Sequence, residues 1–416
     1  MVQYIWRVKS VKVKIIKGTK QIGGCITEIS EGKTKIIIDF GEELDDSKEH
    51  FKLKGLTEGK SIYNAVFITH SHGDHIGLID KINKDIPVYV EEKSLEIHNL
   101  TCDFCGKKRV KRKLNTFKIS KKIKENSVIY DNGDIKVTPY ITDHSSYNSC
   151  MYLIESKEKR ILHTGDFRNH GRKKNIFGKI INTIGKVDLL ITEGTTLTRS
   201  KENFITESEL ESKALNIINN YDQVLIMQSS TNIDRTVSFL RASLQSNKKF
   251  VLDLFSYYIN NAVDLNVNVD YKKIFVWKPY KYKYKPDWFK DKYLDIDASS
   301  KIFPYFTMEV KESMLTDIKM LYNKGKIKNA CLIYSMWDGY IPKEEKLKKF
   351  IEELKNMNIE FIEMHTSGHA DLTAMKKLND VVAPKYTIII HTENNNAGKD
   401  VFNNIIKLKD GEEFIL

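Results

Sequence analysis

The stretch "FITHSHGDHIG", residues 67–77, most constrains what this chain can become, because it places His70, His72, Asp74 and His75 within six positions. The preceding residues "NAVFIT" have the composition of a strand, and α/β folds expose functional side chains in the turn after a strand's carboxyl end. Residues two apart in an extended backbone point the same way. The first two histidines can therefore face one metal ion, while Asp74 and His75 face another. Gly73 is expected to permit a tight turn.

A site for two metal ions needs more ligands than one loop supplies. Further histidines and an aspartate do follow strand-like runs: His144 in "ITDHSS", Asp166 in "LHTGDFR" and His391 in "IIIHTEN". His369 of "TSGHAD" is placed in the same way. Imidazole and carboxylate groups at strand ends are typical ligands of a two-metal hydrolytic site.

Composition limits the class of protein. A chain of 416 residues is long enough for two or three domains, and its longest apolar runs are strand-sized, which predicts no membrane span. The first residues do not read as a signal peptide, and five scattered cysteines argue against a disulfide framework, so we expect a cytoplasmic protein. The net charge of +12 favours a polyanionic partner, although a chain rich in Lys, Ile, Asn and Tyr can be basic without one.

The hydrophobic periodicity predicts strands interleaved with helices in the first 195 residues, including helices at "HIGLIDKIN" and "KSLEIHNL". After Thr196 the order of predicted strands and helices changes. "TESELESKALNIINN" reads as a helix with Thr206 as N-cap, and it opens a second unit of βαβ type that includes the strand "QVLIMQ" and the helix "KEEKLKKFIEELKNM". The tail from Ile359 returns to strand, helix and strand.

Seven motifs in order resemble the metallo-β-lactamase superfamily and, within it, the β-CASP nucleases, with the order and spacing of bacterial and archaeal ribonuclease J. They are Asp39 in "IIIDFG", "THSHGDH", His144, Asp166 in "HTGDF", Glu193 in "ITEGTTL", His369 in "HTSGHAD" and His391 in "IIIHTE". The resemblance implies an α/β fold: an αββα metallo-β-lactamase sandwich with an inserted βαβ-type β-CASP domain. The sandwich would comprise residues 1–197 and 362–416, and the β-CASP domain residues 198–361.

The same resemblance implies roles for these residues. His70, His72 and His144 would bind one Zn²⁺, Asp74, His75 and His391 the other, and Asp166 would bridge the two, with Mn²⁺ or Mg²⁺ as alternative metals. Asp39 would orient the histidine loop. His369, oriented by Glu193, would protonate the leaving oxygen or hold the scissile phosphate, and Asp74 and Asp166 complete the catalytic set. The alternative for Glu193 is an ordinary carboxylate at a strand end.

The implied activity is hydrolysis of phosphodiesters in single-stranded RNA, exonucleolytic, endonucleolytic or both, as in RNA processing. A histidine at position 391 is typical of RNA-processing members of the family, and DNA is the alternative substrate. "MQSSTNIDR" resembles a phosphate-contacting segment, which makes Ser229, Ser230, Thr231, Asn232 and Arg235 candidate substrate-binding residues. Alternatively, Ser230 or Thr231 merely caps the following helix. A homodimer is one possible oligomeric state, because ribonuclease J usually dimerises with the help of a further C-terminal domain.

Three other stretches invite a functional interpretation. The basic run "KKRVKRK", residues 107–113, and the aromatic and lysine-rich residues 277–293 could bind nucleic acid, or could be solvated surface. Cys102 and Cys105 are spaced like half of a zinc site, but two free thiols are the simpler interpretation. His163 reads as a core histidine.

Three other functions compete with the ribonuclease. A DNA nuclease of the same architecture, in repair or defence, would use the same two-metal chemistry. A non-catalytic RNA-binding scaffold would not need Asp74 and Asp166. A small-molecule hydrolase of the glyoxalase type would keep the metal site but leave the inserted domain without a purpose.

Overall fold

The computed structural model describes residues 10–44, 51–120, 122, 125–199, 204–263, 274–278, 293–294 and 303–416. The chain divides into two compact units, one of Met1–Glu202 with Gly368–Leu416 and one of Asn203–Ser367. The borders therefore fall at 202/203 and 367/368, a few residues after the expected 197/198 and 361/362.

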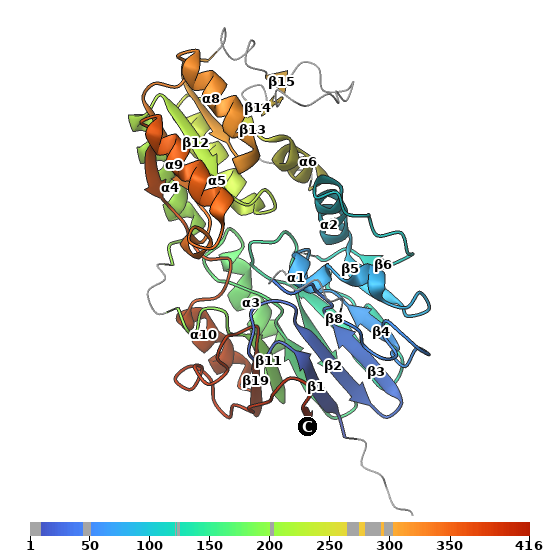
Figure 1. Ribbon diagram of the computed structural model, residues 1–416. Helices are drawn as coiled ribbons and strands as arrows, with labels where there is room; N and C mark the ends of the chain where they lie inside the picture. The colour runs from blue at the N-terminus through green and yellow to red at the C-terminus, as the bar shows by residue number, and fades with distance from the viewer. Residues whose placement is uncertain are drawn as a thin grey trace, which may run out of the picture. The chain divides into compact units, whose positions relative to one another are not determined.

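Two sheets form the first unit (Figure 1). In the first sheet β3 to β6 run parallel, and β2, β1 and β20 continue it in antiparallel fashion. In the second, β7 to β10 are antiparallel, and β10, β11 and β19 are parallel. In spatial order the first sheet is β20 (Glu413–Ile415), β1 (Lys12–Lys17), β2 (Ile26–Glu31), β3 (Thr34–Ile38), β4 (Ala65–Phe67), β5 (Val88–Glu91) and β6 (Asn115–Phe117). The second is β19 (Tyr386–Ile390), β11 (Leu189–Glu193), β10 (Arg160–His163), β9 (Cys150–Glu155), β8 (Lys136–Ile141) and β7 (Tyr130–Asp131).

Alternating side chains build the layers of this unit. In β3, Ile36 and Ile38 pack against residues of the second sheet, while Ile37 joins the cluster on the opposite face. In β11, Ile191 faces the first sheet, and Leu190 packs with α3 (Lys174–Ile184) and α10 (Leu372–Val382), which lie beside the second sheet in Figure 1. Apolar residues on both faces of each sheet require cover on both sides. The result is an αββα sandwich, and the predicted α/β class is confirmed.

The outer face of the first sheet carries the short helix α1 (Gly73–Ile76), the 3₁₀ turn Ile79–Lys81 and α2 (Glu92–Phe104), which contains the helix predicted at "KSLEIHNL". The continuous helix predicted at "HIGLIDKIN" was wrong. The chain leaves the helix at Gly77, and the apolar residues Ile76 and Ile79 still reach the same core from two separate turns.

The second unit is built on a parallel sheet. In spatial order its strands are β15 (Tyr293–Leu294), β14 (Ile274–Trp277), β13 (Lys249–Leu252), β16 (Phe306–Glu309), β12 (Gln223–Met227), β17 (Ala330–Tyr334) and β18 (Glu360–Glu363). Among its described residues, the helices are α4 (Glu207–Asn220), α5 (Ile233–Gln245), α6 (Leu254–Ala262), α8 (Leu315–Asn323) and α9 (Glu345–Asn356), with 3₁₀ turns at Glu312–Met314 and Asp338–Tyr340.

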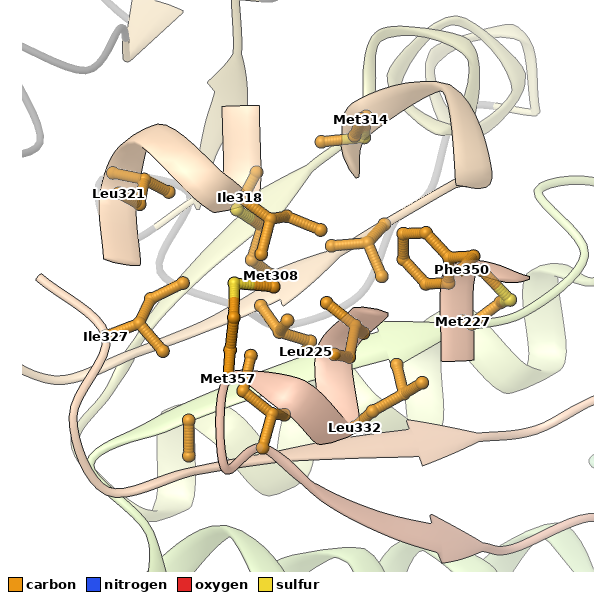
Figure 2. Packing of buried hydrophobic residues seen from close by; sticks show 14 of the residues in the cluster. Leu225, Met227, Met308, Met314, Ile318, Leu321, Ile327, Leu332, Phe350 and Met357 are labelled. Atoms are coloured by element: carbon orange, nitrogen blue, oxygen red, sulfur yellow. The ribbon is translucent and has the colours of Figure 1, made fainter. Parts of the chain in front are cut away.

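The strand β12 shows why this sheet is covered on both faces. Its residues "QVLIM" are all buried, as expected for a central parallel strand. Val224 packs on the side of α4 and α5, whereas Leu225 and Met227 belong to the cluster with α8 and α9 that Figure 2 shows. Thr206 caps α4 as predicted, with Glu209 completing a capping box.

Candidate metal centre

The centre lies where strands of both sheets of the first unit end. In the parallel pairs, Ile38 of β3 lies opposite Phe67 of β4, and Glu193 of β11 lies opposite Ile390 of β19. The next residues of these strands therefore emerge together at one edge, because parallel strands end side by side. Asp39 is the first residue after β3, and its backbone N–H donates to the Phe67 carbonyl at 2.9 Å.

A close backbone approach fixes the histidine loop. The Phe40 N–H donates to the His75 carbonyl and the Glu42 N–H to the Gly73 carbonyl, each at 2.9 Å. Gly41 lies between them, and a Cβ there would sit 1.8 Å from the Asp74 carbonyl oxygen. Gly73, expected to permit the turn, has no such constraint, since a Cβ on it would meet only a Glu42 oxygen at 3.8 Å among the described atoms. The glycine that the loop requires is therefore Gly41.

Three imidazole nitrogens form the first group of candidate ligands. His70 Nε2 is 3.1 Å and His144 Nε2 is 3.2 Å from His72 Nδ1. Ligand atoms at the usual zinc distance in a tetrahedral site lie about 3.3 Å apart. The spacing of these nitrogens therefore suits one ion held by three histidines.

The second group joins the histidine loop to the end of β19. His391 Nε2 is 3.2 Å from Asp74 Oδ2, and His75 Nε2 is 3.6 Å from the same oxygen. His75 Nε2 is buried and makes no hydrogen bond of acceptable geometry within the described part of the chain. A buried ring nitrogen in this condition is costly unless it has a partner such as a metal ion.

The Asp166 carboxylate lies between the two groups. Its Oδ2 is 3.2 Å from His75 Nε2, 3.7 Å from His391 Nε2, 3.8 Å from His70 Nε2 and 3.9 Å from His144 Nε2. One carboxylate oxygen thus faces nitrogens of both groups. This is the position from which a carboxylate can bridge two ions.

The outer ring nitrogens of four of these histidines are held by other groups. His75 Nδ1 donates to Asp39 Oδ2 at 2.8 Å, and His144 Nδ1 donates to the Gly368 carbonyl at 2.6 Å. His70 Nδ1 shares a 2.9 Å hydrogen bond with the Thr69 hydroxyl, and His391 Nδ1 a 2.7 Å bond with the Thr195 hydroxyl. Such contacts fix the ring orientation and leave Nε2 to face the centre.

Asp39 is the most connected of these outer groups. Besides His75, its carboxylate accepts from the Thr69 N–H at 2.7 Å and from the Thr69 hydroxyl at 2.8 Å. Both Asp39 (φ 61°) and His391 (φ 52°) adopt left-handed backbone conformations, which are uncommon for residues other than glycine. Strain of this kind persists where the surrounding structure fixes it, and it concentrates at functional sites.

Burial and charge set the protonation of the ligands. Burial lowers the pKa of His72 to about 4, despite the nearby carboxylates of Asp74 and Asp166. Burial and the neighbouring imidazoles also lower the pKa of His70 and His144. These three side chains are therefore neutral at pH 7, the form that binds metal.

The second group has a different electrostatic setting. Burial acts to lower the pKa of His75, but the three carboxylates around it outweigh burial and raise it. The pKa of Asp166 is lowered, because His391 and His75 outweigh the opposite effect of burial. An imidazole that is protonated because carboxylates surround it can release this proton to solvent when a metal cation binds in the proton's position.

The described residues therefore fit a divalent metal site. Groups of three or four candidate ligand atoms within 4.8 Å of one another include His70 with His72 and His144, and Asp74 with His75 and His391. A third such group joins His70 and His75 to Asp166. The structure brings together all seven predicted metal ligands.

His369 and Glu193 stand beside the centre. His369 Nδ1 is 3.0 Å from Glu193 Oε2 and 3.7 Å from Asp166 Oδ2, and Glu193 Oε1 accepts from the Phe167 N–H at 2.9 Å. Burial would lower the pKa of His369, but Glu193 and Asp166 raise it to about 9. His369 is thus a protonated imidazole at neutral pH.

The candidate substrate residues lie in the second unit, at the start of α5. Asn232, rather than Ser230 or Thr231, caps the helix. Ser229 is exposed, and Ser230 is buried beside the Ser256 hydroxyl at 2.9 Å.

Arg235 was wrongly predicted to bind substrate. Its side chain is fully buried, forms an ion pair with Glu207 at 3.1 Å, and donates to the Ser335 and Thr366 carbonyls at 3.0 Å each. A guanidinium used in this way connects elements of its own unit.

The structure also answers the secondary interpretations of the sequence. Cys102 is buried with its sulfur 3.5 Å from His98 Nε2, and neither Cys102 nor Cys105 joins a group of three ligand atoms among the described residues. All five cysteines are free thiols. His163 is a core histidine, which accepts from the Gly165 N–H at 3.2 Å. Most of the stretch 277–293 lies outside the described residues.

Sequence reasoning missed Thr69, Thr195 and Gly41. Thr69 and Thr195 stand next to or near predicted residues in "THSHGDH" and "TEGTTL", but threonine is common, and its type alone does not mark a contact to a ring nitrogen. Thr195 Oγ1 lies 3.2 Å from His369 Nδ1 as well as contacting His391, so it links the two histidines.

Comparison with known proteins found a matching family and several relatives. The family described as "Beta-lactamase superfamily domain" matches residues 35–223. Ribonuclease J of Helicobacter pylori strain 26695 is 23% identical over 421 aligned positions, which cover 94% of this chain and 57% of that protein. This chain thus spans little more than half the length of that relative.

Two further similarities concern smaller regions or the fold alone. Hydroxyacylglutathione hydrolase of Dictyostelium discoideum is 27% identical over 177 positions, or 38% of this chain and 58% of that protein. A crystal structure of an Enterococcus faecalis V583 protein of unknown function superimposes with a TM-score of 0.81 at 19% identity, covering 98% of this chain and all of the other. Among the described residues, no helix has the length and apolar character needed to cross a bilayer. The predicted resemblance is confirmed: residues 35–223 match the β-lactamase superfamily domain, and the chain is similar to ribonuclease J over most of its length.

Proposed function

We propose that this protein is a metal-dependent phosphodiester hydrolase, a nuclease of the ribonuclease J type that acts on single-stranded RNA. The observation that carries the proposal is the position of Asp166 Oδ2, within 3.2 to 3.9 Å of imidazole nitrogens from both ligand groups. The similarity to ribonucleases J over most of the chain supports the same activity. Two Zn²⁺ ions suit five imidazoles and two carboxylates better than Mg²⁺, which prefers oxygen, and Mn²⁺ is an alternative.

Each residue then has a part in the reaction. His70, His72 and His144 would hold one ion, Asp74, His75 and His391 the other, with Asp166 between them. When bound, two such ions supply an activated water and neutralise the charge on the phosphate oxygens. Asp39 and Thr195 keep the imidazoles oriented through their outer nitrogens.

His369 would protonate the leaving oxygen. With its pKa raised to about 9 it carries a proton at neutral pH, and Glu193, 3.0 Å away, orients the ring. A positioned acid of this kind accelerates a proton-transfer step by about 10² to 10⁴. The same charged imidazole can also hold the scissile phosphate.

Several finer points belong to this proposal. The second unit would be the β-CASP domain, with Ser229, Ser230, Thr231 and Asn232 near the RNA backbone. The free thiols suit a reducing compartment such as the cytoplasm. RNA is favoured over DNA by the similarity to ribonucleases J and by His391. Cleavage would be exonucleolytic, endonucleolytic or both, and the protein would act as a monomer or a homodimer.

The proposal is tested with purified protein on matched oligouridine and oligothymidine, in the presence of Zn²⁺ or Mn²⁺. Asp74→Asn removes one candidate ligand, and Asp80→Asn is its matched control, since Asp80 is an exposed acid six residues further along. We expect the wild type and the control to cleave oligouridine, and the Asp74 variant to lose most of this activity.

Other results would point elsewhere. Cleavage of oligothymidine alone would make the protein a DNA nuclease. Metal binding without cleavage of either strand, but with hydrolysis of S-lactoylglutathione, would favour the small-molecule hydrolase suggested by the Dictyostelium similarity. RNA binding by a protein that holds no metal would favour the non-catalytic RNA-binding scaffold.

A further inference from the structure

The basic run of residues 107–113 lies in the first unit, and six of its seven side chains are cationic. Three of the six are used within the fold. Lys107 Nζ contacts the Glu42 carboxylate at 2.7 Å, Arg109 Nε contacts the Asp103 carboxylate at 2.7 Å, and Arg112 Nη1 donates to the Ile82 carbonyl at 2.8 Å. These contacts hold the segment against the body of the unit.

The other three cations are directed outward. Lys108, Lys111 and Lys113 are exposed, and within the described residues none of them forms a salt bridge or side-chain hydrogen bond. The segment between them is anchored, because the Val110 N–H donates to Asn99 Oδ1 at 3.0 Å. Three like charges on an anchored segment repel one another, and a polyanion would offset that repulsion.

The segment is also joined to the metal centre. Glu42, which binds Lys107, donates its N–H to the carbonyl of Gly73, the residue before Asp74. All of these residues belong to the first unit. The anchored end of the basic segment is therefore one side chain away from the histidine loop.

We propose that Lys108, Lys111 and Lys113 form a phosphate-binding surface that runs from Glu42, next to the histidine loop, to the start of β6. This surface would hold the backbone of single-stranded RNA outside the nucleotides being cleaved. This inference rests on the proposed function for its choice of ligand. Lysines on flexible stems contact phosphates without reading sequence, which suits an enzyme that must accept many strands.

The test replaces these lysines together, as Lys108→Gln, Lys111→Gln and Lys113→Gln. A matched control carries Lys33→Gln, Lys157→Gln and Lys186→Gln, which makes the same change in charge. The control lysines are exposed, and they lie in the turns that precede β3, β10 and β11, none of which pairs with β6. Thermal unfolding, with metal and with metal chelated, shows that each variant is folded in the state used for the binding assay.

Binding of a long fluorescent oligouridine is measured by anisotropy with metal chelated, so that cleavage does not interfere. For single strands the logarithm of affinity falls by about 0.7 per phosphate contact for each unit of log salt. Three lost contacts lower the slope by about 2, so between about 50 and 200 mM salt the wild type should lose roughly twenty-fold more of its affinity than the triple variant. The control should keep the wild-type slope.

The outcomes separate this inference from the proposed function. If the triple variant binds oligouridine with the wild-type affinity and salt slope, the surface is refuted, even when the wild type cleaves RNA. A second outcome is that the wild type cleaves neither strand, while the triple variant, unlike the control, binds oligouridine more weakly and with a smaller salt slope. In that case the surface is supported and the ribonuclease proposal fails. A control that loses as much as the triple variant would refute the surface, because net charge would then account for binding.

Discussion

Replacing Asp39 by asparagine should weaken metal binding without removing a ligand. Asp39 is 1% exposed and touches the centre through His75 alone among the candidate ligands, by the 2.8 Å bond from His75 Nδ1 to Oδ2. Asparagine has nearly the same shape and can keep Oδ1 as acceptor for the Thr69 N–H. It must, however, place an NH₂ group where Oδ2 now accepts two hydrogen bonds.

The magnitude follows from these contacts. A hydrogen bond to a charged group contributes about 1.5 to 3 kcal/mol, and a buried donor left facing another donor costs about 1 to 3 kcal/mol. Loss of such a support to a metal-binding histidine typically lowers metal affinity about 10- to 100-fold. That range corresponds to about 1.4 to 2.7 kcal/mol, which agrees with the loss of one charge-assisted hydrogen bond.

The assay is competition for Zn²⁺ against a coloured chelator, combined with urea unfolding of the metal-free protein. Glu28→Gln is the matched control, since Glu28 is also a buried carboxylate of the first sheet and accepts from the Tyr63 hydroxyl at 2.8 Å, away from the centre. Both variants should lose stability, but only Asp39→Asn should lose zinc affinity. Wild-type zinc affinity in a destabilised Asp39 variant would refute the idea that this carboxylate orients His75.

Four further predictions test other parts of the structure. Zinc at about 100 times its dissociation constant should stabilise the first unit by about 2.7 kcal/mol per site, seen as a rise of several degrees in thermal unfolding that a chelator reverses. Gly41→Ala should cost more than about 4 kcal/mol in urea unfolding, since its Cβ would overlap the Asp74 carbonyl, whereas Gly73→Ala should cost little. His369→Gln should lower the rate of RNA cleavage about 10² to 10⁴-fold with metal content retained, as measured by elemental analysis. Burial and the charge of Asp253 raise the pKa of Glu309 to about 7 from an ordinary 4.5. The folded state therefore holds a proton that the unfolded state has lost, and the free energy of unfolding falls by about 3 kcal/mol as pH rises from about 4.5 to 7. Glu309→Gln should remove this fall, as measured by urea unfolding at about pH 5 and about pH 8.

Much of the candidate centre could be predicted because its ligands come in dense or well-placed motifs. The loop "THSHGDH" supplies four ligand-type residues after one strand, and His144, Asp166 and His391 each follow a run that periodicity marks as a strand. In a parallel sheet such positions meet at one edge, so pattern and topology together predict the cluster. The alternation of strands and helices gave the α/β class for the same reason.

The remaining features depend on contacts that no local pattern encodes. Gly41 matters because the Asp74 backbone packs against it, and that neighbour is 33 positions away, so the sequence favoured Gly73 instead. Arg235 lies in a polar segment that resembles an anion site, yet Glu207 in the preceding helix binds its side chain. Whether a charged residue faces a ligand or a buried partner is decided by tertiary packing, which propensity and spacing do not report.

The two ligand groups differ in what must fold before they exist. His70, His72 and His144 come from one continuous part of the first unit, within 75 positions of one another. Asp74 and His391 are 317 positions apart, and the second group therefore exists only when β19 has paired in parallel with β11. Metal binding at the second group is then coupled to the docking of the return segment that starts at Gly368. His391 also adopts an uncommon left-handed backbone, so part of the free energy of metal binding at the second group would offset this strain. The second site should therefore bind its ion more weakly than the first.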